Sequence, residues 1–187
     1  MSNVVAFSPS PPSLLDPFVG TWICDPMSVS RDRVARRALG EGGVRRLWGC
    51  GSIAALRQCL QDDAVLAEKY AALCASSPEG RLVIARRTLT FSRSAMPFME
   101  AQTVTSAITR VIAAGRMIVV HNAPRPTVSG HALRRRGEWL MVSERYANRN
   151  ALLFPPSPVY RYYRADQEVA DADAASRVVA LTAPRIA

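Results

Sequence analysis

Apolar positions recur at a helical period in the first half of the chain. Residues 53–75 carry two apolar stripes that are out of phase: Ile53, Leu56 and Leu60, then Leu66, Tyr70 and Leu73. The phase changes at Gln61-Asp62-Asp63, so we expect either two helices, with an Asp capping the second, or one kinked helix. Ser52 is placed to cap the first turn.

A shorter helix is predicted upstream, from Ser30 to Leu39. Ser28 or Ser30 can cap its start, and Gly40 with the Gly42-Gly43 pair is expected to stop it. Three of its arginines are spaced i, i+3 and i+4 and therefore share one face: Arg33, Arg36 and Arg37. The result is a short helix with a basic stripe.

Strand patterns surround this helical block. A first strand is predicted over Leu14 to Ile23, ended by Asp25-Pro26 because Pro has no backbone donor. Turns at Ala114-Gly115 and Arg136-Gly137 and a loop over Asn122–Pro126 divide the second half. The later strands are expected over residues 81–92, 103–113, 116–121, 127–135, 138–146 and 160–163.

Consecutive strands joined by short turns favour an antiparallel arrangement. We predict an α+β fold: an antiparallel β-meander or half-barrel of about five or six strands, with a helical block inserted after the first strand. One domain is expected over residues 14–164, with a helical part at 28–76 and a β-rich part at 81–164. Residues 1–13, rich in Ser and Pro, and residues 165–187 are expected to be mobile tails.

Gly20-Thr21-Trp22 opens the predicted first strand, and a meander of strands follows later. This combination resembles the lipocalin-like (calycin) pattern, in which a Gly-x-Trp starts the first barrel strand and the Trp packs against the barrel floor. The resemblance implies a barrel or half-barrel that holds a small apolar ligand. It rests on three residues and an order of strands. The helical block departs from the family, which continues with hairpins after its first strand.

The composition fits a folded domain. The hydrophobic share is 49% and the charged share 21%, and no segment approaches the ~20 apolar residues of a membrane helix. The N-terminus lacks a secretory signal's basic start and apolar stretch, so we expect a cytoplasmic protein, with signal-less export as the alternative. The four cysteines form no CxxC pair, which favours reduced thiols and speaks against zinc.

The formal net charge is +9. Such a charge could attract nucleic acid, an anionic membrane or an acidic partner. However, Lys69 is the only lysine among 24 basic residues, which suggests a GC-rich, bacterial genome that encodes Arg wherever a surface needs positive charge. We give this second interpretation more weight.

Cys50 is the most distinctive candidate for chemistry. It lies between two glycines, at a predicted helix N-terminus and close to Arg45 and Arg46. A helix dipole and nearby cations both stabilise a thiolate, so Cys50 could be a nucleophile or a redox-sensitive thiol, with His121 or His131 as its base. The alternative, which we favour, is a small residue packed in a tight loop and two hydrogen-bonded structural histidines.

Basic and acidic groups in the second half give two further hypotheses. Glu138 and Glu144 are six residues apart and would face one side of a regular strand, where a surface role is the default. Arg161 and Arg164 are interleaved with tyrosines, and such a surface can hold single-stranded nucleic acid. No recognised nucleic-acid motif accompanies them.

No Walker loop, GxGxxG or GxSxG motif is present, so we expect no cofactor, and no metal site is expected. We favour a non-enzymatic binding or adaptor protein that docks a protein partner or holds a small apolar ligand. The alternatives are a nucleic-acid-binding protein with an Arg/Tyr surface and a Cys50-dependent enzyme or redox sensor. The residues predicted to bind are Arg33, Arg36, Arg37, Arg134, Arg136 and Trp22.

Overall fold

Nine strands form one antiparallel sheet in the computed structural model, which describes residues 13–28, 32–125, 127–146 and 159–166. The strands are β1 (Gly20–Cys24), β2 (Gly80–Ile84), β3 (Thr88–Arg93), β4 (Gln102–Ala107), β5 (Arg110–Ala114), β6 (Met117–Arg125), β7 (Val128–Arg136), β8 (Trp139–Tyr146) and β9 (Val159–Arg164). Their order across the sheet is β4-β3-β2-β1-β9-β8-β7-β6-β5. The α+β class and the helical block after the first strand are confirmed, but the predicted number of strands is too low.

Two predicted strands are each divided in two. The segment 81–92 contains β2 and β3, joined by a turn at Arg86 and Arg87, and the segment 103–113 contains β4 and β5, joined at Ile108 and Thr109. Neither connection contains Gly or Pro, so the sequence carries no turn signal there. The predicted start of the first strand is also wrong, because Asp16–Phe18 forms a 3-10 helix, η1, before β1 begins.

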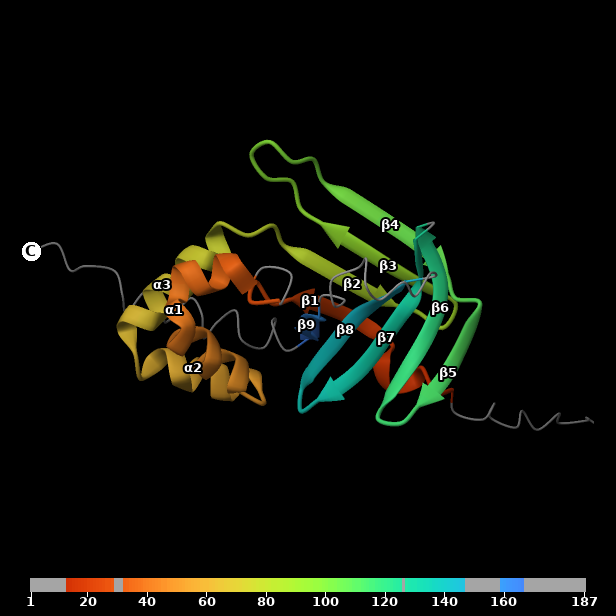
Figure 1. The fold of residues 1–187 in the computed structure, drawn as a ribbon, viewed down its shortest axis with the longest axis horizontal. Helices are drawn as coiled ribbons and strands as arrows, with labels where there is room; N and C mark the ends of the chain where they lie inside the picture. The colour runs from red at the N-terminus through yellow and green to blue at the C-terminus, as the bar shows by residue number, and fades with distance from the viewer. Residues whose placement is uncertain (1–12, 29–31, 126, 147–158, 167–187) are drawn as a thin grey trace, which may run out of the picture.

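The sheet is curled into a half-barrel. Its edge strands, β4 and β5, are consecutive in the chain, and Figure 1 shows β2, β3 and β4 forming one wall opposite β5 to β8. The corner between the edges is fixed by Thr109, whose backbone N and Oγ1 donate to the His121 carbonyl at 2.8 and 2.9 Å. The predicted loop 122–126 is wrong for its first four residues, which continue β6 with a register shift between His121 and Arg125.

Along the chain, three helices follow β1 and precede β2, and they pack at one end of the sheet (Figure 1). They are α1 (Asp32–Gly49), α2 (Ile53–Gln61) and α3 (Ala64–Ala75). The second and third confirm the prediction of two helices, with Ser52 capping α2 and Asp63 capping α3. The predicted end at Leu39 is wrong: Gly40 adopts φ 72°, which kinks the chain, and helix resumes at once. None of the described helices is long and apolar enough to cross a membrane.

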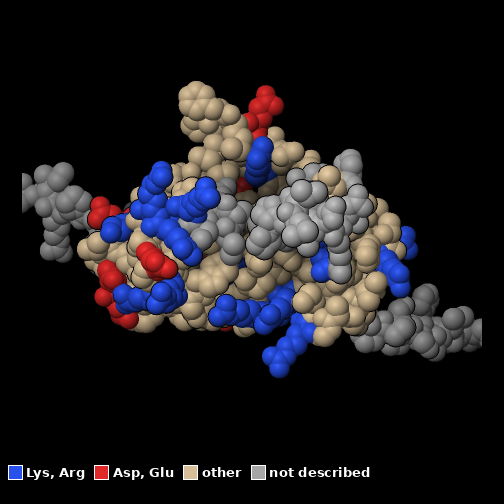
Figure 2. Space-filling view, viewed as in Figure 1, with Lys and Arg blue, Asp and Glu red and all other residues tan. Residues whose placement is uncertain are grey.

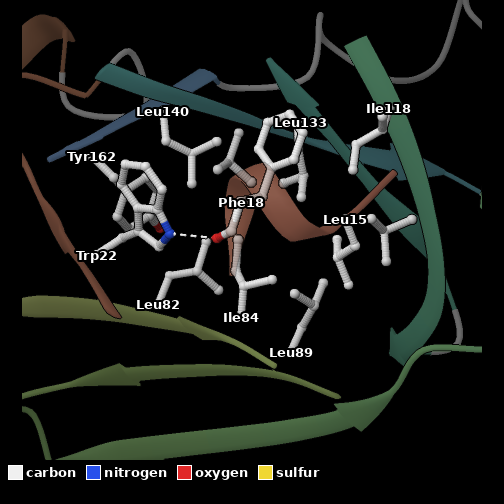
Figure 3. Close-up of a cluster of buried hydrophobic side chains, with 12 residues drawn as sticks. Leu15, Phe18, Trp22, Leu82, Ile84, Leu89, Ile118, Leu133, Leu140 and Tyr162 are labelled. Carbon is white, nitrogen blue, oxygen red and sulfur yellow. Dashed lines mark hydrogen bonds between the residues drawn. The ribbon is translucent and has the colours of Figure 1, made fainter. Parts of the chain in front are cut away.

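Apolar side chains gather on both faces of the sheet. The concave face holds one core, into which η1 inserts Phe18 (Figure 3). That core consists of Leu15, Phe18, Trp22, Leu82, Ile84, Leu89, Ile118, Val120, Leu133, Leu140, Val142 and Tyr162. A second core joins the helices to the outer side of β8 and β9 through Trp139, Met141 and Tyr163. Strict alternation along β8 and β9 thus supplies two cores, one for each face.

Candidate functional site

A cavity of about 360 Å³ opens on the concave face, beyond the packed core. Aromatic and aliphatic side chains form much of its wall, with Phe91 and Val104 on one side and Tyr160 and Tyr162 on the other. The full lining is Cys24, Pro26, Ser28, Pro78, Gly80, Arg81, Phe91, Ser92, Arg93, Gln102, Val104, Pro124, His131, Val142, Glu144, Tyr160 and Tyr162. Both walls of the half-barrel therefore contribute.

His131 is a deeply buried polar residue of this lining, at 3% exposure. Its Nδ1 lies 2.9 Å from Asn122 Oδ1, and Asn122 Nδ2 donates to Ser106 Oγ at 2.6 Å. Ser106 Oγ in turn donates to the Leu89 carbonyl at 3.4 Å. The Phe91 ring lies 4.7 Å from the imidazole, centroid to centroid. This chain of hydrogen bonds holds the imidazole in one orientation on the cavity wall.

Other polar groups of the cavity are also held in place. Cys24 Sγ lies 3.2 Å from Ser28 Oγ, and Glu144 Oε2 accepts a hydrogen bond from the Tyr146 hydroxyl at 3.2 Å. Burial raises the pKa of Tyr162 well above its ordinary value, with Cys24 and Tyr160 adding to the effect. Tyr162 therefore presents a neutral hydroxyl at any physiological pH.

Trp22 lies below the cavity, in the floor of the half-barrel, and is fully buried. Its indole N–H donates to the Phe18 carbonyl at 2.8 Å, shown as the dashed line in Figure 3. Two guanidinium groups cover the ring: Arg164 at 4.6 Å and Arg135 at 5.0 Å from its centroid. Arg164 also donates to the Pro17 carbonyl at 3.3 Å. Trp22 closes the floor and is not part of the cavity lining.

Arg161 occupies the opposite face of the sheet, where β9 meets the helices. Its guanidinium lies between the rings of Trp139 and Trp48, at 4.1 and 4.7 Å from their centroids. Nε donates to Asp25 Oδ2 at 2.6 Å, and Nη2 forms an ion pair with the same carboxylate. Nη1 donates to the carbonyls of Leu47 and Trp48 at the end of α1. This cluster joins β1, β9, β8 and α1.

The predicted binding arginines lie on the surface, away from the cavity. Arg33, Arg36 and Arg37 are exposed on the first part of α1, and Arg36 forms a 4.0 Å ion pair with Glu41. Arg134 and Arg136 are exposed at the end of β7. Their role in docking a partner stays a prediction.

The structure does not bring Cys50 and His131 together. Cys50 packs with the helices on the outer side of the sheet, whereas His131 lines the concave cavity. Burial raises the pKa of the Cys50 thiol, and neighbouring Cys59 raises it further, against a smaller lowering by Arg161 and Arg46. The direction is opposite to the one that a reactive thiolate requires. His121 lies on β6 and its carbonyl serves the β4–β5 corner.

Two further pairings from the sequence are divided by the fold. Glu144 lines the cavity, but Glu138 precedes β8 and accepts a hydrogen bond from the Ile53 N–H at the start of α2. Arg161 is 1% exposed and Tyr162 5% exposed, so the Arg/Tyr segment does not present the open stacking surface that single-stranded nucleic acid needs.

Sequence reasoning missed most of the cavity. Of the candidate residues named from the sequence, His131 and Glu144 line the cavity, each considered there for a different role. The polar residues of the lining come from separate strands, such as Cys24 on β1, Gln102 on β4 and Glu144 on β8. Strand alternation gives the side of each residue only once the register between strands is known. In β8 and β9, for example, Tyr160 pairs with Val142 and Tyr162 with Leu140, so these four side chains share the concave side.

No protein-family model and no curated protein matches the chain. A search of solved structures finds the crystal structure of the wild-type fluorescent protein UnaG, with 14% sequence identity and a TM-score of 0.38, covering 81% of this chain and all of that one. A likeness at that score carries no argument about fold or ligand. Of what the calycin resemblance implied, the structure itself shows the half-barrel: a curled antiparallel sheet with Trp22 buried in its core.

Proposed function

We propose that the protein binds a small, mainly apolar molecule with at least one polar group in the cavity of the half-barrel. The observation that carries this proposal is the cavity itself: about 360 Å³, on the concave face of a sheet whose floor is fully packed. Protein interiors are close-packed, and voids larger than a water molecule are few. Ligand sites of drug-sized molecules begin at about this volume.

The chemistry of the wall supports an amphiphilic ligand. Phe91, Val104, Tyr160 and Val142 offer apolar contact area from both sides. His131, held by Asn122, offers a fixed polar contact between them. A few oriented polar groups in an apolar wall are typical of sites that select one ligand orientation. No catalytic step is needed to account for this arrangement, which favours a binding protein over an enzyme.

Filling the cavity tests the proposal. The probe is 8-anilinonaphthalene-1-sulfonate, whose fluorescence rises on transfer to an apolar site. Val104→Trp places a large side chain on the cavity wall and should reduce the probe's affinity at least about tenfold, because the ring occupies the site. Val83→Trp is the matched control, since Val83 is 39% exposed on β2 and does not line the cavity.

Equal probe binding by the two variants, or no saturable binding by the parent protein, would contradict a cavity site. Native mass spectrometry of protein purified from its own host then identifies the occupant. The expected result is an adduct that is lost on denaturation and is absent from the Val104→Trp variant.

A further inference from the structure

The loop between β3 and β4 presents apolar side chains to solvent. Met96 and Met99 are joined by two backbone hydrogen bonds of 2.8 and 2.9 Å, which close a tight turn with Pro97 and Phe98 at its tip. Phe98 is fully exposed, at 109%, and Met99 is 40% exposed. Figure 2 shows a tan knob standing out from the top of the molecule, with an acidic side chain beside it and a basic one below.

Phe98 occupies a backbone position that favours glycine. Its φ is 67°, in the left-handed region. With Pro97 before it, the turn matches type II, whose third residue needs positive φ and is usually Gly or Asn. A bulky residue there is strained, and its exposed ring gains nothing from the core. The fold therefore holds an aromatic ring outward at a position that a smaller, polar residue would fill with less strain.

The knob stands at the rim of the cavity. Arg93 and Gln102 form the last strand pair before the loop, and both line the cavity. Two hydrogen bonds fix the base of the loop to the start of β2: Ser94 N donates to the Glu79 carbonyl at 2.8 Å, and Glu79 N donates to Ser94 Oγ at 2.9 Å. A surface that receives Phe98 would lie against the cavity opening.

Shape and charge together indicate what that surface is. A convex apolar tip of Pro, Phe and Met can enter the interfacial region of a bilayer, which adapts to it and needs no matching pocket. The net charge of +9 attracts anionic headgroups. Arg93 at the base of the loop adds to this attraction, whereas Glu100 opposes it locally.

We propose that the β3–β4 loop inserts Phe98 into an anionic lipid surface, so that the cavity collects its ligand from the membrane or delivers it there. The delivery step rests on the proposed function, whereas the docking step does not. In this arrangement the protein binds lipid peripherally, through one hairpin tip and a diffuse positive charge.

Phe98→Trp makes the tip its own reporter once the emission of the parent protein is subtracted, because both proteins contain Trp22, Trp48 and Trp139. Trp22 and Trp139 are buried, and Trp48 packs against the second core. Vesicles of equal parts phosphatidylserine and phosphatidylcholine should shift its emission to shorter wavelength, and pure phosphatidylcholine should do so less. Val65→Trp is the control, since Val65 is 62% exposed on α3, away from the tip. An unshifted emission of the Phe98→Trp variant, or an equal shift in the control, overturns the proposal.

Sedimentation with the same vesicles tests the native Phe98 side chain without a tryptophan reporter. Phe98→Asn suits the left-handed backbone and should weaken vesicle binding about tenfold or more, whereas Glu100→Gln should strengthen it. Binding that is indifferent to Phe98→Asn overturns docking, even if 8-anilinonaphthalene-1-sulfonate still fills the cavity in vesicle-free solution. If vesicle binding depends on Phe98 but the protein has no cavity site, the docking step stands and the delivery step is overturned. Capture of a protein through Phe98, with no vesicle binding, also overturns the proposal.

Discussion

Asp25 and Arg161 are each 1% exposed, and they hold the helices to the sheet. The Arg161 guanidinium is buried between two indoles, where one carboxylate and two backbone carbonyls accept its hydrogen bonds. Desolvation of such a pair is expensive, so its net contribution to stability is small, while loss of one partner is costly. The cluster therefore specifies how α1 meets β9 more than it adds free energy.

Asp25→Asn should lower the free energy of unfolding by about 3–5 kcal/mol, because it leaves the Arg161 charge buried without its counter-ion. Urea denaturation followed by Trp fluorescence measures the change. Glu41→Gln is the control: Glu41 pairs with Arg36 and Arg45 on the surface, at 4.0 and 3.9 Å, and its loss should cost at most about 1 kcal/mol. Similar losses in both variants would show that the buried pair has no special role.

Two hairpin turns show how elements are attached to each other. Gly115, between β5 and β6, and Gly137, between β7 and β8, both have φ 61°. A Cβ at Gly115 would meet nothing within 4 Å, whereas a Cβ at Gly137 would lie 2.3 Å from the Gly51 carbonyl oxygen. The second turn is thus packed directly against the segment that leads into α2, where Glu138 N also donates to the Gly51 carbonyl at 3.3 Å.

Gly115→Ala and Gly137→Ala therefore separate backbone strain from packing. We expect Gly115→Ala to lose about 1–2 kcal/mol of unfolding free energy from the left-handed conformation alone. Gly137→Ala should lose more, by roughly 1–3 kcal/mol, because the turn must also move away from Gly51. Urea titrations of the two variants give the difference. Equal losses of unfolding free energy would mean that the segment around Gly51 moves away from the turn with no loss of stability.

Across the whole molecule, the two walls of the half-barrel are connected by polar groups on the concave side. The hydrogen-bond chain from His131 on β7 runs through Asn122 on β6 to Ser106 on β4 and ends at the Leu89 carbonyl on β3. It crosses between strands that share no ladder, near the corner at Thr109. The chain therefore fixes the spacing of the walls and, with it, the width of the cavity.

Asn122→Leu removes both side-chain bonds of this chain at similar volume. It should cost about 1–3 kcal/mol, because His131 and Ser106 lose a buried partner. Amide hydrogen exchange in β4 should accelerate more than in β2. Thr105→Val is the control, since it removes a single exposed hydroxyl pair with Thr90, 3.0 Å apart, on the outer side of the sheet. Unchanged exchange in β4 would refute the connection between the walls.

The sequence by itself determined the local elements whose signals are local. The apolar stripes and capping residues around Ser52 and Asp63 specified α2 and α3, and glycine at Gly115 and Gly137 marked two hairpins. It also determined the antiparallel pairing of the strands that short turns join, because such turns allow no other pairing. Turns without Gly or Pro, such as Arg86 and Arg87, gave no signal, so the number of strands was underestimated.

Only the tertiary structure decided which side of each strand faces the cavity and which polar groups meet. Asp25 and Arg161 are far apart in the chain, as are Ser106, Asn122 and His131, and no local pattern encodes such pairs. Phe98 is also placed by the tertiary structure. An apolar side chain is expected to be buried, but the direction of the β3–β4 turn leaves Phe98 exposed. Register and curl fix these relations, because a shift of one residue would exchange the two faces of the sheet.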